Sequence, residues 1–177
     1  MEENTPVAID DELAGWFAGT IPADLYSAPP QISGDRDEVL IVGAVADVEL
    51  PEGSSDAAQA AARSARIARF RHETRGQRMT VAREAERLFG RKVSWGAECG
   101  GVRELFTTLG VPVMTRLRLS ERAVLDTLID AGVARSRSEA LAWCVALVAR
   151  HQDDWIKSLR DALTKVEEAR AQGPQLG

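Results

Sequence analysis

The chain has 177 residues, of which 45% are hydrophobic and 28% charged, a composition typical of soluble globular proteins with one or two domains. No stretch approaches the roughly 20 consecutive apolar residues of a membrane span, and the acidic N-terminus is unlike a secretory signal peptide, so we expect a cytoplasmic protein without a membrane partner. The net charge of −5 is unevenly distributed: residues 1–56 carry 13 acidic side chains and one basic side chain, whereas residues 57–122 carry 14 basic and six acidic ones. A basic surface that contacts nucleic acid is therefore compatible with the negative total.

Residues 1–37 are acidic, and Pro29 and Pro30 interrupt any long regular element. Leu13, Trp16 and Phe17 fall within a stretch that favours a short helical turn. Large apolar side chains are costly to leave in water, so we expect these residues to dock on another part of the protein. The sequence therefore predicts an anchored acidic N-terminal arm.

Residues 38–110 are predicted to form a small α+β domain of βαββ type. The apolar run from residue 38 to residue 45 favours a buried strand, and alternating patterns favour two further strands, over residues 92–98 and 103–109. Gly100 and Gly101 between the last two strands favour a hairpin turn.

A long helix from Ala57 to about Phe89, with a bend at Gly76, is predicted between the first strand of this domain and the hairpin. Its surface is rich in arginine, which allows two interpretations. Arg71, Arg75 and Arg78 are candidate additional contacts to nucleic acid phosphates. Alternatively, the arginines pair with neighbouring glutamates in a solvated helix face; the candidate glutamates are Glu73, Glu84 and Glu86.

The segment from Val113 to Ala149 is the most informative part of the chain. It begins with an alternating pattern typical of a short strand, whose two faces would carry Thr115, Leu117 and Leu119 on one side and Met114, Arg116 and Arg118 on the other. An isolated strand is unstable in water, so we expect it to pair with the same strand of a second copy. A helix, a turn at Gly132 and a second helix follow. The second helix begins with a capping box formed by Ser136 and Glu139.

This order of elements resembles the ribbon–helix–helix family of dimeric DNA-binding proteins, which includes the methionine repressor, Arc and plasmid copy-number repressors. The resemblance covers residues 111–150, about a fifth of the chain, and rests on the 116–119 strand, the helix start at Ser120, Gly132 and the run from Ser136 to Ala140. It implies that Met114, Arg116 and Arg118 face DNA bases in the major groove. It also implies that the start of the second helix holds a DNA phosphate, through Arg135, Ser136, Arg137 and Ser138.

The remaining patterns do not favour catalysis. The sequence contains no glycine-rich phosphate loop, no nucleophile motif and no metal-ligand spacing around His72, His151, Cys99 or Cys144. We therefore expect a protein that is not an enzyme, with no catalytic residue, metal or cofactor. An amphipathic C-terminal helix is predicted to extend to about Ala169 and to pack on its own domain or on a dimer partner.

Together these features predict an α+β protein with an N-terminal arm (1–37), an α+β domain (38–110) and a ribbon–helix–helix-like domain with a C-terminal helix (111–171). We expect a homodimer that binds double-stranded DNA and regulates transcription, most simply as a repressor. One alternative is a module for oligomerisation or protein interaction without catalysis. Another is an RNA-associated protein that uses the arginine-rich helix. The sequence indicates no particular operator or small-molecule effector.

Overall fold

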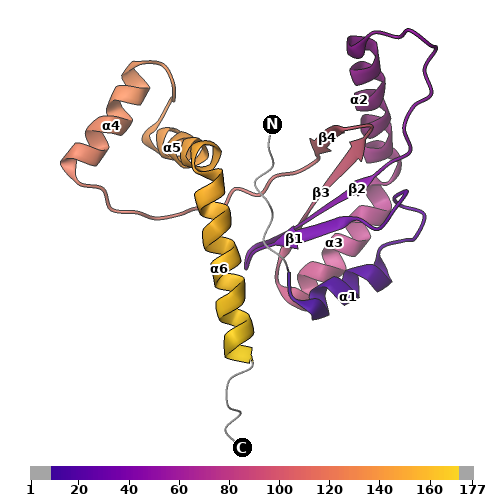
Figure 1. Cartoon of the computed structure of the whole chain (residues 1–177), viewed down its shortest axis with the longest axis horizontal. Helices are drawn as coiled ribbons and strands as arrows, with labels where there is room; N and C mark the ends of the chain where they lie inside the picture. Colours follow the sequence, from indigo (N-terminus) through magenta and orange to yellow (C-terminus); the bar gives the residue numbers. More distant parts are fainter. Residues whose placement is uncertain (1–8, 172–177) are drawn as a thin grey trace, which may run out of the picture. The chain divides into compact units, whose positions relative to one another are not determined.

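The computed structural model describes residues 9–171, apart from the side chains at positions 153, 160, 167 and 171. The described chain divides between Pro112 and Val113 into two compact units. We call residues 9–112 the N-terminal unit and residues 113–171 the C-terminal unit. Together they make a mixed α+β protein, with the only sheet of the described residues in the N-terminal unit (Figure 1).

The N-terminal unit contains three helices and a four-stranded sheet. Its elements, in chain order, are α1 (Asp11–Thr20), β1 (Gln31–Gly34), β2 (Glu38–Ala44), α2 (Asp56–Glu73), α3 (Arg75–Phe89), β3 (Lys92–Cys99) and β4 (Val102–Leu105). The strand order is β1-β2-β3-β4. The central pair β2–β3 is parallel because α2 and α3 form the crossover between its strands, whereas the two outer pairs are antiparallel.

One core joins this sheet to the helices. Alternate residues of β2 and β3, such as Ile41 and Trp95, point into it and meet Ile67 and Phe70 from α2. Gly43 is required within β2, because a Cβ at this position would stand 2.3 Å from ring atoms of Tyr26. The core thus depends on a residue from the predicted arm.

Within the described residues, the prediction that Leu13, Trp16 and Phe17 dock on another part of the protein is confirmed, but residues 9–37 belong to the N-terminal unit itself instead of forming an arm beside it. Leu13 and Phe17 of α1 are buried in the main core. The Trp16 ring makes edge-to-face contacts with the rings of Phe17 and Phe89, at centroid distances of 4.9 Å and 5.4 Å. Strand β1 pairs with β2. The predicted βαββ layer therefore gains a strand at its edge, and the N-terminal unit begins before residue 38.

The predicted long helix is two helices, and the break lies at Thr74 instead of Gly76. The Thr74 hydroxyl donates to the Phe70 carbonyl at 2.7 Å, and the Arg78 guanidinium donates to the Arg71 carbonyl at 2.6 Å. Side chains thus satisfy carbonyl groups at the end of α2, which stabilises the interruption.

The predicted hairpin after β3 is present, with Gly100 and Gly101 at φ values of +52° and +84° that favour glycine. Its second strand is shorter than the predicted 103–109, because pairing to β3 ends at Leu105. Phe106, the next residue, is buried in the main core.

The C-terminal unit consists of the helices α4 (Leu119–Asp130), α5 (Arg137–His151) and α6 (Asp153–Ala171), preceded by an extended segment, residues 113–118. Its core is small: among the described residues, only Leu125, Ala134 and Ala140 form the buried cluster. In the single chain, residues 113–118 do not form the predicted strand, and Leu119 is the first residue of α4 instead of the last residue of a strand. A strand needs a hydrogen-bonded neighbour, and among the described residues no strand pairs with this segment.

Candidate nucleic-acid interface

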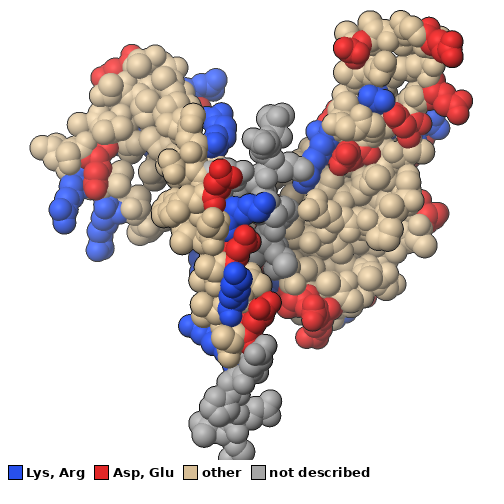
Figure 2. Space-filling model, in the orientation of Figure 1, with Lys and Arg blue, Asp and Glu red and all other residues tan. Residues whose placement is uncertain are grey.

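The extended segment presents two basic side chains on either side of an inward-facing leucine. Arg116 and Arg118 are exposed, whereas Leu117 is half-buried and packs against the small core of the C-terminal unit. The expected alternation therefore holds for residues 116–118 but does not extend to Thr115 and Leu119, which are exposed although they were expected on the face of Leu117. Figure 2 shows basic side chains projecting from the C-terminal unit where this segment leads into α4. Met114, the third predicted base-facing residue, is 96% exposed.

Local hydrogen bonds fix how the segment enters α4. The Arg122 guanidinium donates to the Leu117 carbonyl at 2.6 Å, and the Arg118 backbone N–H donates to the Glu121 carboxylate at 2.6 Å. The first contact ties the extended backbone to α4, and the second satisfies an amide at the helix start. Arg122 was not among the predicted site residues.

The start of α5 has the predicted cap in a slightly different form. The Ser136 hydroxyl accepts a hydrogen bond from the Glu139 backbone N–H at 3.2 Å, as a capping box requires. The Glu139 carboxylate, however, accepts from the backbone N–H of Arg135 at 2.8 Å, one residue before the cap. Arg135, Ser136, Arg137 and Ser138 are all exposed at this helix end.

Arg137 is already engaged within the unit. Its guanidinium forms two hydrogen bonds with the Asp126 carboxylate of α4, at 2.7 and 2.8 Å. These hydrogen bonds hold the pKa of Asp126 below its ordinary value. Arg137 therefore joins α5 to α4, and a contact to DNA phosphate would compete with this pair. Sequence spacing gave no sign of the pair, since its partners lie on different helices.

Part of each predicted set of DNA contacts lines one hollow of about 330 Å³, whereas Arg116 and Arg118 do not line it. Met114 and Thr115 of the extended segment line one side of it, and Arg137 and Ser138 of α5 line the other. Leu125 and Leu141 contribute apolar surface to the same hollow. The structure thus brings these parts of the segment and of α5 together within a single unit.

The third predicted set lies in the N-terminal unit, and its members differ in exposure. Arg71 and Arg75 are exposed, but Arg78 is only 6% exposed. The expectation that Arg78 contacts a phosphate from a helix surface is wrong, because its side chain turns inward over the ring of Phe106. The paired-arginine alternative holds for Arg69, which forms an ion pair with Glu73 at 2.7 Å.

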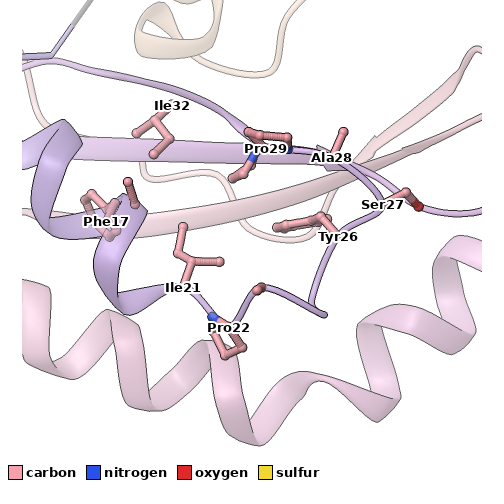
Figure 3. A pocket seen from close by; sticks show the side chains of 11 residues that line it. Phe17, Ile21, Pro22, Tyr26, Ser27, Ala28, Pro29 and Ile32 are labelled. Carbon is pink, nitrogen blue, oxygen red and sulfur yellow. The ribbon is translucent and has the colours of Figure 1, made fainter.

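A second hollow, of about 430 Å³, lies between the end of α1, the loop that follows it and β1 (Figure 3). Phe17, Ile21, Pro22 and Ile32 give it an apolar lining, to which no charged side chain of the described residues contributes. Burial raises the pKa of Tyr26, and its hydroxyl donates to the Gly96 carbonyl at 3.0 Å. The Tyr26 hydroxyl is therefore engaged in a hydrogen bond to the sheet.

Metal-ligating side chains are not gathered in the part of the chain that the structure describes. Among the described residues, no three His, Cys, Asp or Glu side chains are grouped so that they could hold a metal ion. In the same part of the chain, none of the helices has the length and apolar character needed to cross a bilayer.

Comparison with known proteins gives matches that follow the two units. Residues 11–105 match the family model described as the N-terminal domain of Rv1265-like proteins, and residues 118–170 match the Mb1296 C-terminal domain. The chain belongs to the Rv1265-like family. Its relatives include uncharacterized protein Rv1265 of Mycobacterium tuberculosis (strain H37Rv) and uncharacterized protein Mb1296 of Mycobacterium bovis. Each is 54% identical over 163 residues, which cover 92% of this chain and 70% of the relative. No solved structure shows significant similarity to the chain.

Proposed function

We propose that this member of the Rv1265-like family is a homodimeric DNA-binding protein that regulates transcription, with a ribbon–helix–helix arrangement in its C-terminal unit. The observation that carries the proposal is that the C-terminal unit has a small buried core among its described residues and an exposed basic segment before α4. Leu117 links the two features, because it lies within the basic segment and packs against that core. The relatives' names do not mention DNA, so the proposal rests on this geometry and on the sequence resemblance.

The described residues of the C-terminal unit bury little apolar surface. Their buried cluster has three members, two of them alanines, whereas Val113, Met114 and Leu119 are 84%, 96% and 74% exposed. Small units with too little core are commonly stabilised by oligomerisation. A second copy of the unit would cover apolar surface that a single copy leaves in water.

Pairing of residues 113–118 with the same residues of a second copy would complete the ribbon. Leu117 would remain on the inner face, against the helices, while Arg116 and Arg118 of each chain would stand on the outer face. A two-stranded ribbon fits the major groove of DNA, and arginine forms two hydrogen bonds with a guanine edge there.

The start of α5 would contact the DNA backbone beside the ribbon. Its amide groups and the positive end of its dipole favour a phosphate, and Arg135 and Ser138 are exposed next to them. Because Arg137 is engaged with Asp126, we assign it to holding α5 against α4 and assign the phosphate contact to its neighbours.

The test is fluorescence anisotropy of the full chain with duplex DNA over a salt series. Arg116→Ala/Arg118→Ala should weaken binding at least about tenfold, since one arginine–guanine contact is worth about 1–3 kcal/mol. The matched control is Arg83→Ala/Arg87→Ala, which removes the same charge from exposed positions of α3. Equal affinity of the two double variants would overturn the ribbon as the DNA-reading element. A dimer that binds no duplex DNA at low salt would instead favour an oligomerisation module, and preference for single-stranded RNA would favour the RNA-associated alternative.

A further inference from the structure

Three arginines converge where α2 ends and α3 begins. Arg71 lies in the last turn of α2, and Arg75 and Arg78 lie in the first turn of α3, on the two sides of the break at Thr74. The guanidinium carbon of Arg78 stands 4.7 Å from the ring centroid of Phe106, and that of Arg71 stands 5.6 Å from the same centroid. The ring of Phe106 therefore contacts two cationic groups, one buried and one exposed.

The buried member of this trio is held in place. The Arg78 Nε donates to the Thr74 hydroxyl at 3.0 Å, and its Nη2 donates to the Arg71 carbonyl at 2.6 Å. These two acceptors satisfy hydrogen-bond donors of the Arg78 guanidinium, but neither of them carries a negative charge. The guanidinium therefore has a fixed position and keeps its uncompensated charge.

Acidic side chains do not neutralise the trio. Within the described residues, Arg63 and Arg69 of α2 form ion pairs, but none is formed by Arg71, Arg75 or Arg78. Burial lowers the pKa of Arg78, and the charges of Arg71 and Arg75 lower it further, against the opposing effect of Tyr26. The three guanidiniums thus repel one another in the free protein, and an anion beside them would relieve this repulsion.

The junction that holds these arginines is also the N-terminus of α3. Thr74 provides no side-chain cap for α3, a helix of 15 residues, although the same residue ends α2, whose last carbonyl groups lie beside the first amides of α3. In the first turn, the position that a Cβ on Gly76 would occupy has no described atom within 4 Å beyond the adjoining helix backbone and chain neighbours. This leaves room for a ligand to approach the backbone closely.

We propose that the junction of α2 and α3 binds a phosphate group, with Arg71 and Arg75 as the direct contacts and Arg78 as a fixed charge behind them. The guanidinium fork matches the oxygen geometry of phosphate, and the helix start adds amide donors. The phosphate belongs either to a small phosphorylated molecule or to a nucleic acid backbone. For a small ligand the site is independent of the ribbon, whereas for DNA it rests on the proposed function and adds a second contact.

The test uses pyrophosphate as the probe and the full chain as the receptor, with isothermal titration calorimetry at low ionic strength. Arg71→Gln/Arg75→Gln should weaken pyrophosphate binding at least about tenfold, because it removes two charge-assisted hydrogen-bonding groups. The control is Arg83→Gln/Arg87→Gln, which removes an equal charge from exposed positions of α3 away from the junction. It should change binding by less than about twofold.

A second measurement distinguishes the source of the phosphate. If the site serves DNA, the Arg71/Arg75 variant should flatten the salt dependence of duplex binding by about 0.9 for each DNA phosphate that the protein no longer neutralises, and the control should not. Loss of pyrophosphate binding without a change in this slope assigns the site to a small phosphorylated ligand. If both double variants behave alike with pyrophosphate and with DNA, the proposal is wrong. The ribbon proposal is tested independently of this site, because Arg116→Ala/Arg118→Ala should leave pyrophosphate binding intact.

Discussion

The two units of this chain differ in the size of the hydrophobic core that their described residues bury. In the N-terminal unit, fifteen described hydrophobic residues form one buried cluster around a four-stranded sheet. In the C-terminal unit, the buried cluster of the described residues has three members, although its helices are no shorter. The difference indicates that the first unit folds as a self-sufficient body. The second has the helices of a domain around a much smaller buried cluster, and under the proposed function a second copy would complete its core.

The largest effect is expected from opening the core of the N-terminal unit. Phe17→Ala removes a fully buried ring of α1 and should destabilise that unit by about 3–5 kcal/mol. Hydrogen exchange of the full chain, read by mass spectrometry, should show reduced protection in peptides from residues 9–112 alone. A reduction that spreads equally over both units would contradict their independence.

A smaller effect is expected at the cap of α5 in the C-terminal unit. Ser136→Ala removes the hydroxyl that accepts from the Glu139 backbone N–H, which should cost about 1 kcal/mol. Under the proposed dimer, part of this loss should appear as weaker self-association in sedimentation equilibrium. The N-terminal unit should melt as before, and a lower melting temperature there would argue against two separate bodies.

The smallest effect concerns the ion pair of Arg63 with Asp47 in the N-terminal unit. The hydrogen bonds from Arg63 lower the pKa of Asp47 from 3.8 to about 2. A carboxyl group whose pKa is lowered by folding stabilises the protein above its ordinary pKa, and this contribution is lost as the pH falls toward 2. Because the pair is partly exposed, Asp47→Asn should lower the melting temperature only slightly at pH 7. The difference from the wild type should shrink progressively below about pH 4. A difference that does not change with pH would show that the charge of Asp47 is not its cause.

Local patterns in the sequence were enough to predict some elements. Gly100 and Gly101 marked the β3–β4 hairpin, and Ser136 marked the start of α5, because turns and caps depend on neighbouring residues. Strand β1 escaped prediction because Gln31–Gly34 contains one large apolar residue and is defined by its pairing with β2.

The candidate sites show the same division between local and distant information. The exposure of Arg116 and Arg118 around an inward Leu117 followed from alternation along the chain. The inward turn of Arg78 and the pairing of Arg137 with Asp126 depend on contacts between separate elements, which spacing alone does not encode. Those contacts changed the roles that could be assigned to both arginines.

Hydrogen exchange at two protein concentrations, alongside sedimentation equilibrium, tests most directly the claim that a second copy completes the C-terminal unit. We expect a dimer whose dissociation on dilution lowers the protection of amides in residues 113–171, with protection of the N-terminal unit unchanged. A monomer at every concentration, with equally protected amides in α4 and α5 throughout, would contradict this claim and would remove the basis for the DNA-binding ribbon.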